Sequence, residues 1–168
     1  MSRDADLPPD GGRHRPKPVA ILPPRPRHVE GLAQLSRAFA EESSWASTIP
    51  IGRITDQREA FSRLFGQDVI AVRIAETPSG SVVGYVGVYH HPEVDHVSIL
   101  VRADYRRTGL GRQLMDEVFD SLPEGLEIEA WVGAFNEVSL QAMSGLGFES
   151  DRMITDRGRT VHIFTRQS

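Results

Sequence analysis

The chain has 168 residues, 39% of them hydrophobic, a formal net charge of −4 at pH 7 and no cysteine. Its length predicts one domain, and the lack of cysteine excludes disulfides and a cysteine nucleophile. The acidic balance argues against a general nucleic-acid binder, and no apolar run approaches the roughly 20 residues that cross a bilayer. We therefore expect no nucleic-acid partner, no membrane partner and a cytoplasmic location, which the absence of cysteine favours.

Residues 1–17 contain Pro, Gly, Asp and Arg with almost no large apolar side chain. This composition predicts a disordered N-terminal leader. The leader has no apolar core of the kind that a secretory signal needs. The folded domain is expected to occupy residues 18–168.

The pattern after the leader predicts one strand and then two helices. A short apolar run at 17–22 favours a strand, which three closely following prolines end. Apolar residues at helical spacing predict a helix over 27–43. Asp56 begins a capping-box pattern that is typical of the start of a second, short helix. The segment 43–55 between the helices, which contains Trp45, is predicted to be a loop.

Strands dominate the middle of the chain. Runs rich in β-branched and aromatic residues predict strands over 69–75 and 82–90, joined as a hairpin by the turn residues 77–81. A third strand is predicted over 94–101. A helix with one apolar side is predicted to follow it over 109–122.

The last part of the chain alternates again. A strand is predicted over 126–132, and Asn136 is a good N-cap for a helix that ends at Gly147, where a left-handed glycine is expected. Two final strands, 148–155 and 159–166, flank a turn. The order β-α-α-β-β-β-α-β-α-β-β predicts an α+β fold with a mixed, mostly antiparallel, twisted sheet flanked by helices.

One turn, where the third predicted strand becomes a helix, combines paired arginines with paired glycines. Its residues are Arg106, Arg107, Thr108, Gly109, Leu110, Gly111 and Arg112. The first amides of a helix lack internal partners and lie at the positive end of its dipole, so they form an anion site. The glycines allow close approach of a ligand, and guanidinium donors suit phosphate oxygens. The combination favours a diphosphate over a carboxylate.

Three interpretations of this turn compete. The first is a plain strand–helix connection with solvated arginines. It leaves the glycines without a use, although each lowers the stability of a helix by about 1 kcal/mol. A dinucleotide-binding turn needs a third glycine where Leu114 stands, and hairpins do not precede it in that fold. A P-loop is excluded because no Gly-Lys-Ser/Thr is present.

The third interpretation comes from a family resemblance. Residues 106–111 resemble the Arg/Gln-x-x-Gly-x-Gly/Ala signature of the GCN5-related N-acetyltransferase (GNAT) superfamily, where this turn binds the pyrophosphate of acetyl-coenzyme A (acetyl-CoA). Residues 136–148 resemble the family's second segment, an Asn-capped helix closed by Gly-Phe. The element order over 19–166 is also similar. The resemblance implies the GNAT fold, acetyl-CoA as cosubstrate, and an amine acceptor that is a small molecule or a protein.

In this family the strand before the signature splays from the next strand, and the pantetheine arm lies in the V between them. The resemblance implies that the turn residues given above bind the cosubstrate. It adds residues of the strand and of the later helix: Ile99, Leu100, Val101, Asn136 and Met143. A backbone N–H of the strand, expected at Leu100, would stabilise the developing oxyanion. Final strands of this fold often pair across a dimer, so a homodimer is open.

Met143 departs from the family pattern. Many members have a tyrosine there that protonates the leaving thiolate, whereas methionine has no proton to give and is most simply a packing residue. Two hypotheses stay open. A thiol, with a pKa of about 8–9, leaves without an acid, or with water or another hydroxyl in its place. Alternatively, the domain binds acyl-CoA without transferring the acyl group.

Polar residues cluster at the entrance to the central strand. Asp95 is the expected base there, in competition with Glu93 and His96, although each could be a solvated turn residue. With His90 and His91 they could pass for a metal cluster. Adjacent histidines on a strand point to opposite faces, so we expect no metal.

Overall fold

The computed structural model describes residues 18–42, 54, 56–156 and 158–168. The leader predicted over 1–17 lies outside the described residues, as does nearly all of the predicted loop 43–55 with Trp45. No helix in the described ranges is both long enough and apolar enough to cross a membrane.

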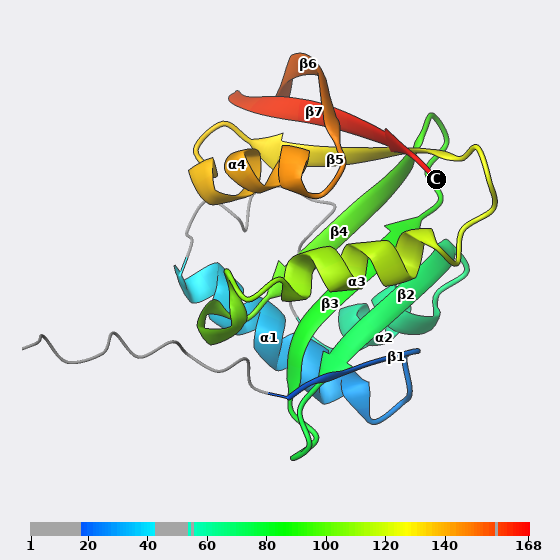
Figure 1. The fold of residues 1–168 in the computed structure, drawn as a ribbon, viewed down its shortest axis with the longest axis vertical. Helices are drawn as coiled ribbons and strands as arrows, with labels where there is room; N and C mark the ends of the chain where they lie inside the picture. The colour runs from blue at the N-terminus through cyan, green and yellow to red at the C-terminus, as the bar shows by residue number, and fades with distance from the viewer. Residues whose placement is uncertain (1–17, 43–53, 55, 157) are drawn as a thin grey trace, which may run out of the picture.

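The described elements follow the predicted order (Figure 1). In chain order they are β1 (Ala20–Leu22), α1 (His28–Glu42), α2 (Gln57–Phe65), β2 (Val69–Glu76), β3 (Val82–Tyr89), β4 (Asp95–Val101), the 3-10 helix η3 (Ala103–Tyr105), α3 (Leu110–Phe119), β5 (Glu127–Gly133), α4 (Glu137–Gly145), β6 (Glu149–Asp156) and β7 (Arg159–Gln167).

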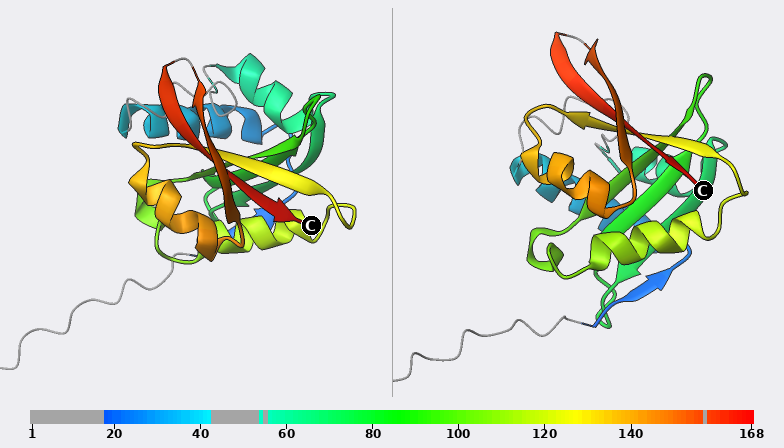
Figure 2. Two further views of the ribbon diagram at one scale, coloured as in Figure 1. Left: turned by 90° about the horizontal axis from the view of Figure 1, so that it is seen from above. Right: turned by 45° about the horizontal axis from the view of Figure 1, so that its top comes forward.

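The described strands form one seven-stranded sheet in the order β1-β2-β3-β4-β5-β7-β6. Neighbouring strands are antiparallel except β4 and β5, which are parallel. The hairpin of β6 and β7 projects beyond β5 at one edge of the sheet (Figure 2). This confirms the predicted α+β, mostly antiparallel fold. It also excludes the doubly wound parallel sheet that a dinucleotide-binding turn requires.

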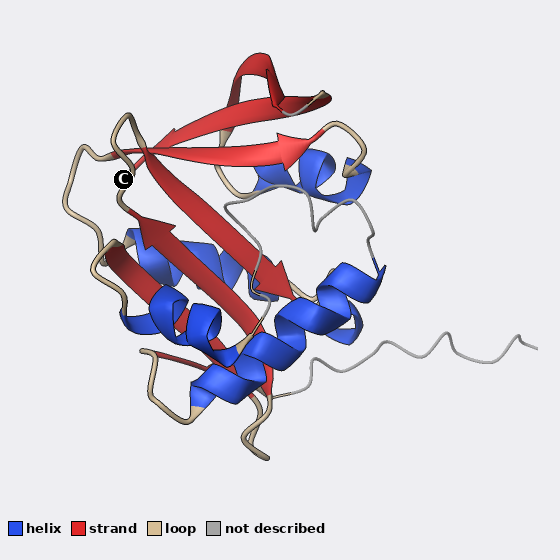
Figure 3. Ribbon diagram, turned by 180° about the vertical axis from the view of Figure 1, so that it is seen from behind, coloured by secondary structure: helices blue, strands red, loops and turns tan. Residues whose placement is uncertain are grey.

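Helices cover both faces of the sheet. α3 lies on one face and α1 with α2 on the other (Figures 1 and 3). α3 packs closely because residue 84 of β3 is glycine: a Cβ there would stand 2.8 Å from Leu114 Cδ1 and 3.1 Å from Ala75 Cβ. The apolar side predicted for α3 is confirmed, since Leu110, Leu114 and Met115 are buried beneath it.

A second buried cluster lies between the sheet and the pair α1 and α2. It includes Tyr85 and Tyr89 of β3, whose hydroxyls are hydrogen-bonded to each other. Tyr89 also donates to the Arg63 carbonyl of α2 at 2.8 Å. Burial raises the pKa of Tyr85, so its phenol stays protonated as a donor. The space above Gly87 is filled, since a Cβ there would lie 2.6 Å from the Tyr85 hydroxyl.

The helix caps agree with the sequence. Asp56 accepts the Glu59 N–H at 2.9 Å and begins α2, and Asn136 accepts the Ser139 N–H at 3.0 Å and begins α4. α4 ends at Gly145, two residues before the predicted end, and Gly147 then takes a φ of 82°. The predicted left-handed glycine is therefore confirmed.

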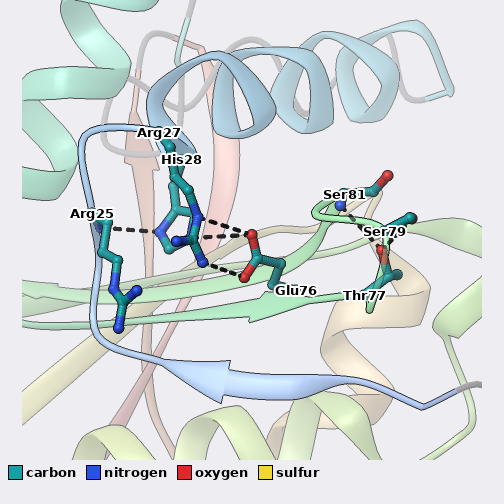
Figure 4. Close-up of polar contacts among 7 residues, drawn as sticks. All are labelled: Arg25, Arg27, His28, Glu76, Thr77, Ser79 and Ser81. Atoms are coloured by element: carbon teal, nitrogen blue, oxygen red, sulfur yellow. Dashed lines mark hydrogen bonds and ion pairs between the residues drawn. The ribbon is translucent and has the colours of Figure 1, made fainter.

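A partly buried ion pair, which the sequence did not reveal, holds the start of α1 against β2 (Figure 4). Arg27 Nε and NH2 donate to the two oxygens of Glu76 at 3.2 and 2.7 Å. His28 Nδ1 accepts the Arg25 N–H at 3.0 Å, and its Nε2 lies 3.5 Å from Glu76 Oε1. The bond to Arg27 lowers the pKa of Glu76, whereas burial lowers that of His28. Protonation of Glu76 or His28 in acid should therefore weaken the contact between the start of α1 and β2.

Candidate functional site

The site is a V-shaped opening between two parallel strands. β4 and β5 are paired only through Asp95 with Ile128 and His96 with Glu129. Beyond these residues the strands diverge, β5 pairing with β7 and β4 with β3 (Figure 1). The edge of β4 that faces β5 is therefore left without a ladder partner over 97–101 among the described residues. The splayed strands implied by the family resemblance are present.

The alternation of the β3–β4 ladder decides which amides face the V. The Arg102 N–H donates to Val83 O at 2.9 Å, so Leu100, two residues earlier and opposite Tyr85, also directs its N–H at β3. The amides of Ile99 and Val101 then point the other way, into the V. The N–H of Leu100, the expected oxyanion donor, is therefore directed at β3, and its two neighbours in the strand present theirs to the V. Sequence spacing alone does not fix the phase of a ladder.

The turn after β4 forms a curved string of amides at the open end of the V. Arg107 and Gly109 have φ of 60° and 88°, and the first α-helical bond runs from Gln113 N–H to Gly109 O at 3.1 Å. The N–H groups of residues 110–112 come before that bond and have no intrahelical partner. Left-handed residues next to a helix start create an anion-binding concavity. Thr108 stiffens the turn by donating to Tyr105 O at 2.6 Å.

The two glycines of the turn differ in what they allow. Gly109 needs its positive φ, and a Cβ there would meet nothing within 4 Å. Gly111 has no positive φ, and a Cβ there would make ordinary contacts of 3.8 Å with Ile99 and Val101. Backbone conformation explains Gly109, but neither packing nor conformation within the described part of the chain requires a glycine at residue 111.

The three arginines of the turn lie in three different environments. Arg106 donates to Val101 O at 2.9 Å and pairs with Glu42 at 2.7 Å, so it braces β4 against α1. Arg112 donates to Gly145 O at the end of α4. Arg107 is exposed and has no side-chain partner among the described residues. Of the three guanidinium groups implied for phosphate binding, Arg107 alone is uncommitted within the described ranges.

The helix α4 follows β5, and its C-terminal end lies beside the start of α3. Its last carbonyls are held by cations: Arg112 bonds Gly145 O, and Arg166 of β7 bonds Leu146 O at 2.7 Å. Met143 is 3% exposed and packs in the apolar core, which agrees with the packing role expected for it and leaves little surface for a cosubstrate. Asn136 uses its side-chain oxygen for the cap.

The face of β4 and β5 that points away from α3 carries a polar cluster. Glu129 is 3% exposed, and its two oxygens accept Trp131 Nε1 and Arg152 NH2, each at 2.7 Å. The His96 ring lies 4.5 Å from that of His91 and 5.1 Å from that of Trp131, centroid to centroid. Sequence reasoning missed Glu129 and Trp131 as a pair. The alternation of the segment 126–132 could have placed both on one face.

Asp95, the expected base, lies at the turn between β3 and β4. Its Oδ1 is 3.2 Å from His90 Nδ1 and accepts the His91 N–H at 3.4 Å. Its cross-strand partner Ile128 belongs to the α3 side of the sheet, so Asp95 lies on the face opposite to His96. Within the described ranges, no group of three or more His, Cys, Asp or Glu residues could hold a metal ion.

The V, the amide-lined turn and the helices around them define the architecture of an acyl-coenzyme A-dependent transferase of the GNAT type. The model of the Acetyltransferase (GNAT) family matches residues 35–148, which is more than half of the chain. The chain belongs to this family. No curated protein sequence matches it significantly.

Solved structures share the fold at low sequence identity. A GNAT-family acetyltransferase from Streptococcus pneumoniae is 14% identical with a TM-score of 0.69, covering 89% of this chain and 99% of its own. A phosphinothricin acetyltransferase from Sinorhizobium meliloti in complex with AcCoA is 16% identical (TM-score 0.64, 89% and 88% covered). Arabidopsis thaliana NAA60 in complex with a bisubstrate analogue is 18% identical (TM-score 0.63, 89% and 98% covered).

Proposed function

We propose that this chain transfers the acetyl group of acetyl-CoA to an amine by direct attack. The observation that carries the proposal is the position of the amide-lined turn at the open end of the V between β4 and β5. A ligand with linked phosphates at one end and a long, hydrogen-bonding arm fits this arrangement. The phosphates suit the turn, and the arm suits the open V. Membership of the family and the acetyl-CoA and AcCoA complexes of structural neighbours support it.

The turn would hold the pyrophosphate. The amides of residues 110–112 supply the donors, and Arg107 adds a full positive charge at the rim. Gly111 lets the phosphates approach the backbone, which explains a glycine that neither packing nor conformation requires. The pantetheine arm would lie along the unpaired edge of β4, where Ile99 and Val101 present backbone groups. The Val101 carbonyl is already taken by Arg106.

The acetyl group would sit beside the Ile99 amide. A donor fixed in the strand needs no rearrangement to meet the charge that develops on the thioester oxygen. No proton donor stands at Met143, which is packed in the core. A thiol with a pKa of about 8.5 leaves without one at little cost near neutral pH.

The packing of Met143 favours one alternative, a domain that binds acyl-CoA without transferring the acyl group. Two measurements separate the hypotheses. Calorimetric titration with acetyl-CoA tests the site, with a nicotinamide dinucleotide as the comparison ligand. A panel of amines, followed by release of free thiol, tests transfer.

We expect acetyl-CoA to bind, the dinucleotide to bind far more weakly, and at least one amine to give turnover. Absence of acetyl-CoA binding at millimolar concentration would contradict the proposed site. Binding without thiol release across small amines, amino acids and peptides would establish the alternative.

A further inference from the structure

His96 is a buried histidine whose ring nitrogens both lack a hydrogen-bond partner in the part of the chain that the structure describes. Its side chain is 3% exposed. Buried polar atoms without partners are uncommon in native proteins and call for a specific explanation, such as a water or a catalytic role. An imidazole with a free acceptor nitrogen is also a ready base.

The ring is held in place by its neighbours. His91 and Trp131 pack against it, and Trp131 is itself fixed by its bond to Glu129, which Arg152 also binds. His96 and Glu129 are the last paired residues of β4 and β5, so the ring stands at the vertex of the V.

Burial lowers the pKa of His96, and nearby His91 adds to that effect. The charges of Glu129, Asp95 and Glu93 oppose it. The net lowering keeps the imidazole neutral near pH 7. It can therefore accept a proton without first losing one.

His96 lies on the face of β4 that α3 does not cover. On the other face, Ile99 and Val101 pack beneath Gly111 of α3. We therefore place the acceptor on the side of α1 and α2, where alternation puts the side chains of residues 96, 98 and 100. Ile99 is three residues beyond His96, or roughly 10 Å along the strand, which one or two waters can bridge.

We propose that His96 receives, through water, the proton that the acceptor ammonium must lose before it attacks. This inference rests on the proposed acetyl transfer. The ammonium gives one proton to His96, which passes it to solvent. The nitrogen lone pair forms the N–C bond, the C–S bond breaks, and the second proton of the nitrogen ends on the sulfur as the thiol. Glu129 and Trp131 are positioning residues for the ring.

The test compares three variants with the wild-type chain. His96→Gln keeps a polar side chain of similar size but cannot titrate. His162→Gln is the matched control. His162 is the cross-strand partner of Val132, and it lies on the face of the sheet opposite to His96. Asp95→Asn tests the competing base. Acetyl-CoA affinity and thermal unfolding are measured for each, and kcat/KM is followed from pH 5.5 to 9 with an amine that the wild-type chain acetylates.

We expect His96→Gln to bind acetyl-CoA as the wild type does, to lose about 100-fold or more in kcat/KM at neutral pH, and to lose the fall in rate toward acid. His162→Gln should keep the wild-type kcat/KM and its fall toward acid. A His96 variant that retains wild-type kcat/KM and its acid limb overturns the inference, and so does loss of that limb in Asp95→Asn.

A second measurement does not depend on any variant. The imidazole resonances of His96 in the labelled wild-type chain should titrate with pH at the same midpoint as the acid limb. A His96 ring that does not titrate between pH 5.5 and 9 overturns the inference about His96 but not the proposed acetyl transfer. A wild-type chain that binds acetyl-CoA but acetylates no amine contradicts the proposed function, and with it the inference.

Discussion

Gly111 lies directly over Ile99: a Cβ on residue 111 would stand 3.8 Å from Ile99 Cδ1, an ordinary van der Waals contact. The protein itself therefore has room for a side chain where it has none. A ligand against the helix start is the remaining physical reason for a glycine there.

Gly111→Ala should separate folding from cosubstrate binding. Alanine is the better helix former by about 1 kcal/mol, so thermal unfolding should be unchanged or higher. The added methyl group blocks the approach of phosphate, so acetyl-CoA affinity should fall about tenfold or more, as calorimetry would show. Gly145→Ala in α4 is the control, because a Cβ there meets nothing within 4 Å. Equal affinities for both variants would place the pyrophosphate elsewhere.

Arg106 and Arg107 are adjacent but should respond differently to replacement by alanine. Arg106→Ala removes the brace to Val101 O and Glu42, so the free energy of unfolding should fall by about 1 kcal/mol. Arg107→Ala should leave stability unchanged, weaken acetyl-CoA binding severalfold, and reduce the dependence of that binding on salt. Denaturant titration and calorimetry at two ionic strengths measure the two effects. A loss of stability in Arg107→Ala and none in Arg106→Ala would contradict the environments described for the two side chains.

The sequence predicted much of the fold because local signals and the tertiary structure agree. The capping residues Asp56 and Asn136 and the glycine at 147 act through neighbouring backbone, so a sequence pattern contains their whole mechanism. The signature turn is similarly local. Its position after β4 follows from chain order alone.

What the sequence could not supply depends on pairs that are distant in the chain. The ladder phase that turns Ile99 rather than Leu100 into the V is set by Val83 pairing with Arg102. The partners that commit Arg106 lie partly on α1. The contact of His96 with Trp131 requires the β4–β5 register, and no local pattern encodes which strands become neighbours.

Gly87→Ala should destabilise the fold on the face of the sheet opposite to α3. A Cβ at residue 87 would lie 2.6 Å from the Tyr85 hydroxyl, which is buried and hydrogen-bonded to Tyr89. Moving this pair strains a packed core, so the free energy of unfolding should fall by about 1–3 kcal/mol. Denaturant unfolding measures it, with Gly145→Ala as the matched glycine replacement. A variant as stable as the wild type would mean that the tyrosines can shift freely.

Stability should decline in acid in two stages. Burial lowers the pKa of His28 from 6.5, so the unfolded chain binds this proton first, and stability present above pH 6.5 falls as the pH drops below it. The bond from Arg27 lowers the pKa of Glu76 from 4.5, so a further loss follows below pH 4.5.

His28→Gln should weaken the first stage and Glu76→Gln the second, whereas Glu117→Gln, an exposed position on α3, should change neither. Thermal unfolding between pH 3 and 8 measures both stages. His96, whose pKa burial also lowers, adds to the first stage, so His28→Gln should reduce it without removing it. A first stage that His28→Gln leaves unchanged would mean that His28 is not a source of the acid sensitivity.

The acceptor should be an amine whose pKa lies close to that of an imidazole. A base that is neutral near pH 7 takes a proton far more easily from an α-amino group, with a pKa of about 7.7–8.0, than from a lysine ε-amine near 10.4. At pH 7 the difference corresponds to about 100-fold or more in the neutral, attacking fraction. At saturating acetyl-CoA and pH 7, kcat/KM for α-amines should exceed that for ε-amines by about this factor. Both kcat/KM values can be measured by thiol release from peptides that carry one free amine each. A preference for the ε-amine at pH 7 would contradict this prediction.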